Sequence, residues 1–151
     1  MLFYPLALLI AAADQLLKYL VQRDLPVGRS YTLADHVLKL THVHNTGAAF
    51  SLFVGFSPYL AAVGLVVAAV VVVLHHRTPA RSVALQFGLA LILGGSLGNL
   101  CDRVTRHYVI DYIDFIVWPV FNLADVSINT GVVILAYQLF VREKNDAADP
   151  V

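Results

Sequence analysis

The sequence predicts a membrane α-helical protein with four transmembrane helices. A small extracytoplasmic β-sheet is expected between helices 1 and 2, and a short loop or helix between helices 3 and 4. Of the 151 residues, 59% are hydrophobic and 13% are charged, and the mean hydropathy is +0.75. Soluble domains are about 45–50% apolar and about 25% charged. The length suits one integral membrane domain, residues 1–151.

Four apolar stretches approach the roughly 20 residues that a helix needs to cross a bilayer. They cover about 2–21, 58–74, 83–103 and 123–141. The second is rich in valine, but its length favours a helix over a strand. Residues 11–13 could pass for a signal-peptide cleavage site. The start lacks a basic region and the apolar stretch continues to Leu20, so we expect a retained first helix.

The segment of about 24–55 is too polar to span a membrane. Within it, residues 38–44 alternate between two faces, which is the period of a strand. We therefore predict a small sheet that rests on the membrane surface. The polar tail, about 143–151, is predicted to be disordered.

The positions of lysine and arginine favour both termini in the cytoplasm. That orientation places the short, dense basic loop 75–81 inside. The outer basic residues are spread over longer segments or lie beside acids, where the positive-inside rule has less force.

Several function classes lack support in the sequence. The net charge is zero and no basic run occurs, so we expect no nucleic-acid partner. The single cysteine, Cys101, excludes an internal disulfide and a cysteine-based zinc site. His42 and His44 share a strand face without an evident third ligand, so no metal is predicted.

Ionisable residues inside membrane helices are costly and by default indicate function. Asp14 and Lys18 stand four residues apart in the first helix, in the favourable order for an ion pair. Such a pair could serve the structure alone, or it could serve a site.

The third helix carries a polar stripe beside small residues. Gly95, Gly98, Asn99 and Asp102 fall within an arc of about 60°. The spacing Gly94-x-x-x-Gly98 favours close packing of another helix, with Asn99 and Asp102 pointing into the seam.

Carboxylates concentrate in the stretch "VIDYIDFIVWPVFNLAD", residues 109–125. Asn122 could cap the fourth helix, with Asp125 in its first turn. Two neighbouring carboxyl groups can share a proton, so that one activates water while the other donates to a carbonyl oxygen or leaving amine. Spacing alone leaves open whether Asp102, Asp111 or Asp114 is the partner of Asp125.

Other function classes fit the sequence less well than an aspartic protease does. HExxH, the motif of a membrane zinc protease, does not occur, and no GxSxG lies beside a membrane histidine as a serine protease would need. A proton-conducting protein also uses acids in its helices, but these acids cluster near one face. A scaffold protein would explain the glycines, but not Asp111 and Asp125 together.

Five motifs occur in the order found in one known family. They are "DQLLK" (14–18), "NTGAAFSL" (45–52), "GGSLGNLCDR" (94–103), "VIDYIDF" (109–115) and "FNLADVSINTG" (121–131). Together they resemble lipoprotein signal peptidase, also called signal peptidase II, an aspartic protease of the bacterial inner membrane. The resemblance implies that Asp111 and Asp125 are catalytic. It also implies supporting roles for Asp14, Lys18, Asn45, Gly47, Asn99, Asp102, Arg103, Asn122 and Ala124.

The resemblance further implies the reaction and its setting. The expected substrate is a diacylglyceryl-modified prolipoprotein, cleaved before its lipid-bearing cysteine, without a metal or organic cofactor. The enzyme would act as a monomer in the cytoplasmic membrane, with its active site near the extracytoplasmic face, and would be sensitive to globomycin. The connection from Asp111 to Asp125 looks shorter than is common in the family, which predicts a smaller lid.

Overall fold

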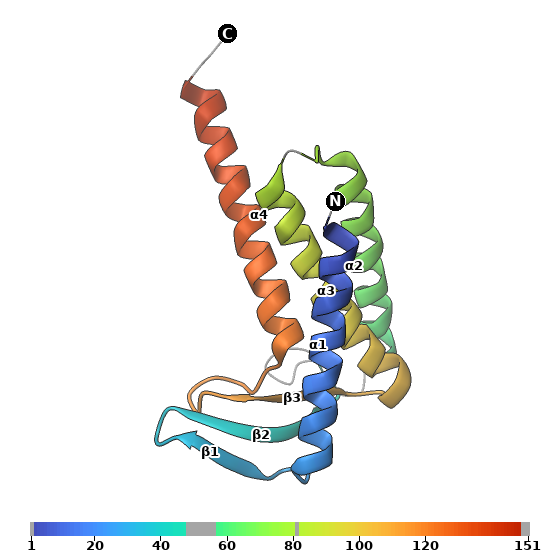
Figure 1. Cartoon of the computed structure of the whole chain (residues 1–151), viewed down its shortest axis with the longest axis vertical. Helices are drawn as coiled ribbons and strands as arrows, with labels where there is room; N and C mark the ends of the chain where they lie inside the picture. The colour runs from blue at the N-terminus through green and yellow to red at the C-terminus, as the bar shows by residue number, and fades with distance from the viewer. Residues whose placement is uncertain (1, 48–56, 81, 149–151) are drawn as a thin grey trace.

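The computed structural model describes residues 2–47, 57–80 and 82–148, with side chains described up to residue 141. Within these ranges, four long apolar helices stand side by side above a small sheet (Figure 1). The helices are α1 (Phe3–Asp24), α2 (Ser57–Arg77), α3 (Val83–Arg106) and α4 (Leu123–Ala148). Each is long and apolar enough to cross a membrane, as the sequence predicted.

Helix α3 is the centre of the bundle, because it packs against α1, α2 and α4. In the most apolar window of α3, 61% of residues are buried, against 17–22% in the other three helices. The outer helices expose large apolar side chains such as Leu9, Val66 and Val133. Such exposed apolar faces suit contact with lipid rather than water.

Glycines bring the backbones of α1 and α4 close to α3. A Cβ atom on Gly94 would lie 2.7 Å from the carbonyl oxygen of Ala7, and one on Gly98 would lie 2.5 Å from Oδ2 of Asp14. A Cβ on Gly95 would instead collide with the carbonyl oxygen of Ala124 in α4. The predicted close packing at Gly94 and Gly98 is therefore confirmed, and α1 is the helix that approaches.

The sheet differs in part from the prediction. Strands β1 (Ser30–Ala34) and β2 (Leu38–Asn45) lie between α1 and α2, as expected. A third strand, β3 (Val109–Asp114), occupies the connection between α3 and α4, where a loop or helix was predicted. The order is β1-β2-β3, with antiparallel pairs. The first four residues of β3 are all buried, so the strand lacks the alternation that indicated β2.

Pairing of β2 with β3 brings two distant motifs together. Asn45 is the register partner of Val109, and Val43 is the partner of Asp111. At the end of α3, His107 adopts a left-handed conformation with φ of 66°, which turns the chain into β3.

The expected disordered tail is also corrected in part. Helix α4 continues through residue 148, whereas disorder was predicted from about 143. Arginine, glutamate, lysine and alanine are good helix formers, and extending an existing helix avoids the cost of a new nucleus. Residues 149–151, like residues 48–55 of the predicted sheet region, lie outside the described residues.

Candidate active site

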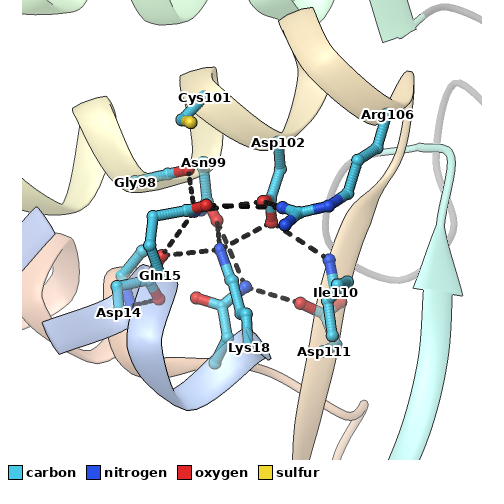
Figure 2. Close-up of polar contacts among 12 residues, drawn as sticks. Asp14, Gln15, Lys18, Gly98, Asn99, Cys101, Asp102, Arg106, Ile110 and Asp111 are labelled. Carbon is cyan, nitrogen blue, oxygen red and sulfur yellow. Dashed lines mark hydrogen bonds and ion pairs between the residues drawn. The ribbon is translucent and has the colours of Figure 1, made fainter. Parts of the chain in front are cut away.

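A cluster of buried charges joins α1 to α3 at the sheet end of the bundle. Figure 2 shows Lys18 of α1 surrounded by acceptors from both helices. Its Nζ lies 2.7 Å from Oδ2 of Asp14 and 2.9 Å from Oδ2 of Asp102, and it donates to Oδ1 of Asn99 at 2.9 Å. The side chains of Lys18, Asp14 and Asp102 are all fully buried. The three contacts use the three donors of the ammonium group.

Asp14 and Asp102 extend this cluster to the other elements. Asp14 Oδ1 accepts a hydrogen bond from the backbone N–H of Ala124, in the first turn of α4, at 3.0 Å. Asp102 Oδ2 accepts one from the backbone N–H of Ile110 in β3 at 3.2 Å. The Asp14–Lys18 pair is therefore structural, and it also positions the two elements that carry the remaining acids.

Two members of the cluster were missed by the sequence analysis. Gln15 donates to Asp102 Oδ1 and to the carbonyl oxygen of Gly98, both at 3.0 Å. Arg106 forms an ion pair with Asp102 and donates to Oε1 of Gln15 at 3.3 Å. The signals were present, since Gln15 interrupts an apolar run and Arg106 follows Asp102 by one helical turn.

Asp111 and Asp125 line the same cavity, which has a volume of about 1000 Å³. Asp111 Oδ1 accepts a hydrogen bond from Nδ2 of Asn122 at 2.6 Å, and its Oδ2 accepts one from Nδ2 of Asn45 at 2.8 Å. Asp125 Oδ1 accepts one from Nδ2 of Asn99 at 2.8 Å. Side-chain amides from β2, α3 and the start of α4 thus fix both carboxyl groups.

Asn122 has both roles that the sequence analysis gave it, the helix cap and the support of the acids. Its Oδ1 caps α4 by accepting from the backbone N–H of Asp125 at 2.9 Å, and its own backbone N–H donates to Oδ2 of Asp125 at 3.3 Å. This is the reciprocal pattern of a capping box. The same side chain donates to Asp111, so the cap of α4 also aligns the two acids.

Asn99 connects the charged cluster to the cavity. Its Oδ1 accepts from Lys18 and, at 3.2 Å, from Nδ2 of Asn122, while its Nδ2 donates to Asp125. Because an ammonium group only donates, Lys18 fixes which end of the Asn99 amide faces Asp125.

The environment of Asp111 favours its protonated form. Burial and the charge of Asp125 raise the pKa of Asp111 to about 7, although hydrogen bonds from Asn45 and Asn122 act in the opposite direction. Near neutral pH, Asp111 therefore exists in both protonation states. Two such carboxyl groups in one cavity match the acid and base of an aspartic peptidase.

The other predicted residues occupy distinct places. Arg103 and Asn45 line the cavity, and Gly47 lies between them. The Gly47 backbone N–H donates to Oδ1 of Asn45 at 2.9 Å, and its carbonyl oxygen lies 3.5 Å from Nη2 of Arg103. Asp114 instead accepts from Thr41 at 2.6 Å and does not line the cavity.

The two histidines of β2 are held by packing. The ring of His44 stacks on Tyr108 with centroids 3.8 Å apart, and Nδ1 of His42 lies 2.6 Å from the carbonyl oxygen of Leu25. Burial, with a smaller contribution from His42, lowers the pKa of His44. The buried Nε2 atoms of both rings have no hydrogen-bond partner within the described residues.

A membrane helix bundle with two carboxyl groups in one cavity has the features of an intramembrane aspartic peptidase. Comparison with known families agrees, because the model of signal peptidase (SPase) II, peptidase A8, matches residues 6–141. The chain therefore belongs to the signal peptidase II family, as the motifs predicted.

Individual relatives support this membership over nearly the whole chain. A lipoprotein signal peptidase of Moorella thermoacetica is 40% identical, over 98% of this chain and 99% of that protein. The lipoprotein signal peptidase of Bacillus subtilis is 37% identical, over 93% of this chain and 94% of that protein.

Solved structures match the fold as well. One, described as a bacterial membrane enzyme determined by the in meso method at 2.3 Å resolution, has a TM-score of 0.90 and 27% identity. The match covers 97% of this chain and 92% of that one. A second structure with the same description, at 1.9 Å resolution, has a TM-score of 0.81, 28% identity and 89% coverage of both chains. The predicted multi-pass membrane fold is thus confirmed.

Proposed function

We propose that this signal peptidase acts on prolipoproteins and that Asp111 and Asp125 are its catalytic residues. The bond cleaved would be the peptide bond before a diacylglyceryl-modified cysteine. The observation that carries the proposal is that the two carboxyl groups line one cavity and are held there by three asparagine side chains. The curated relatives are named for lipoproteins, which supports this substrate class.

The two acids would act by general acid–base catalysis. Ionised Asp125 takes a proton from a water molecule, whose oxygen attacks the scissile carbonyl carbon. Protonated Asp111 donates to the carbonyl oxygen as the tetrahedral intermediate forms. When the C–N bond breaks, the proton held by Asp125 passes to the leaving nitrogen, which becomes the new N-terminus. The intermediate's hydroxyl proton returns to Asp111.

The remaining predicted residues would support these steps. Arg103, in the cavity wall, is suited to donate hydrogen bonds to backbone carbonyl oxygens of an extended peptide. Asn45 and Asn122 orient Asp111, and Asn99 orients Asp125. The contacts that hold α1, α3, β3 and α4 together are made by the other supporting residues, Asp14, Lys18, Asp102 and Ala124.

The enzyme is further proposed to work as a monomer, with its cavity on the extracytoplasmic side and both termini in the cytoplasm. All residues named for catalysis belong to one chain. Helix α1 begins and α4 ends at the end of the bundle opposite the sheet (Figure 1). At that same end, Arg77 closes α2, which agrees with the positive-inside rule.

The orientation is testable with a membrane-impermeant thiol reagent on spheroplasts. In a Cys101→Ala background, Val37→Cys lies in the exposed β1–β2 turn, and Ala80→Cys lies in the α2–α3 connection. Labelling of the first variant alone is expected. Labelling of Ala80→Cys alone would contradict the proposed orientation.

The catalytic assignment predicts the effect of three matched substitutions. Asp111→Asn and Asp125→Asn each lower the rate of cleavage of a diacylglyceryl-modified prolipoprotein peptide by about 10²–10⁴-fold, because each removes a group that must exchange a proton. Asp114→Asn, the control in the same strand, stays close to wild type. The measurement is single-turnover cleavage in lipid. Equal losses in all three folded variants would refute the assignment of the dyad.

The pKa of Asp111 predicts the pH dependence. Since only protonated Asp111 can donate to the carbonyl oxygen, kcat/KM falls as the pH rises through about 7. Asn45→Ala removes a hydrogen bond that favours the charged form, so the pKa of Asp111 rises further and the decline moves to higher pH. The control is Thr41→Val, which removes a hydrogen bond to Asp114 instead. In this variant, kcat/KM falls over the same pH range as in wild type. A shift to lower pH in Asn45→Ala would contradict this account.

A further inference from the structure

A polar side chain lines the cavity one turn deeper in the membrane than Asp125. Asn129 follows Asp125 by four residues, so the two lie on the same side of α4, about 6 Å apart along the helix axis. Both line the cavity, together with Val126 and Ile128. The cavity thus extends from the two acids along the apolar part of α4.

Asn129 is exposed, and its amide makes no hydrogen bond to any other side chain or backbone group in the described part of the chain. Asn122 and Asn99, by contrast, each use their amides in several hydrogen bonds. An unpaired amide within a membrane-spanning helix is costly, because lipid chains offer no partner. Such a group calls for a polar partner inside the cavity.

We propose that Asn129 binds an ester carbonyl of the diacylglyceryl group on the substrate cysteine and thereby determines specificity for a diacylated substrate. This inference rests on the proposed function. An ester oxygen only accepts hydrogen bonds, and the Asn129 amide supplies two N–H donors. An ester carbonyl that entered the cavity without finding a donor would lose the hydrogen bonds it had before binding.

The covalent structure of the substrate fits this placement. The nearer ester carbonyl carbon is about eight bonds from the scissile carbonyl carbon, through the cysteine sulfur and the glyceryl unit, or roughly 10 Å at full extension. With the scissile bond between Asp111 and Asp125, a chain of this length reaches one helical turn further along α4. The fatty acyl chains would then continue past Val126 and Ile128 towards the lipid.

The experiment compares two substrate peptides that differ only at the ester carbonyls. One carries a diacylglyceryl thioether and the other a dialkylglyceryl thioether of equal chain length. Wild type is expected to prefer the diacyl peptide by about fivefold in kcat/KM, the effect of about one neutral hydrogen bond. Asn129→Leu loses this preference through a higher KM for the diacyl peptide. Asn129→Gln, which keeps an amide, regains part of it.

The matched control is Gln138→Leu, which removes an amide from α4 at a position that does not line the cavity. It keeps the preference of wild type. An unchanged preference in Asn129→Leu, or no preference in wild type, would overturn the role of Asn129 while leaving the proposed function intact. Failure of wild type to cleave either peptide would instead overturn the proposed function, and this inference with it.

Discussion

The buried ammonium group of Lys18 is the interaction on which the rest of the structure depends. It binds Asp14 and Asp102 on opposite helices and fixes the amide of Asn99. A lone charge in this position would cost several kcal/mol, and only the full set of partners makes its burial tolerable. The two carboxylates also bind backbone N–H groups of Ala124 and Ile110. A change at Lys18 is therefore expected to affect both elements that carry a proposed catalytic residue, β3 and α4.

The arrangement separates charge balance from catalysis. Asp14 and Asp102 form ion pairs with Lys18 and Arg106 and do not line the cavity, so the proposed mechanism gives them no proton to transfer. Asp111 and Asp125 face the cavity and receive hydrogen bonds from neutral amides. Neutral donors orient a carboxyl group without cancelling its repulsion from a neighbour. The pKa of Asp111 stays high despite its hydrogen bonds mainly because the group is buried, and also because of the charge of Asp125.

Local patterns in the sequence were enough to predict the helices, β2 and the neighbourhood of the acids. Hydropathy located the spans, and alternation located the strand, because both depend on which side chains are buried along one segment. Strand β3 was missed because it is buried on both faces, and the reach of α4 was underestimated because its polar end extends an existing helix. The choice among Asp102, Asp111 and Asp114 needed tertiary partners such as Lys18, Asn45 and Thr41, which no local spacing reveals. The family resemblance made that choice, and the cavity supports it.

The most direct test of the central claim is the thermal stability of Lys18→Met in detergent micelles. This variant keeps the bulk of the side chain but leaves Asp14 and Asp102 buried without Lys18, so the free energy of unfolding falls by about 3–5 kcal/mol. A triple variant that also carries Asp14→Asn and Asp102→Asn lacks the unpaired buried carboxylates, so it regains part of the lost free energy of unfolding. Arg23→Met, which breaks an exposed ion pair with Asp24 in the same helix, leaves the melting temperature nearly unchanged. If Lys18→Met melts at the same temperature as Arg23→Met, the buried ammonium group does not hold these elements together.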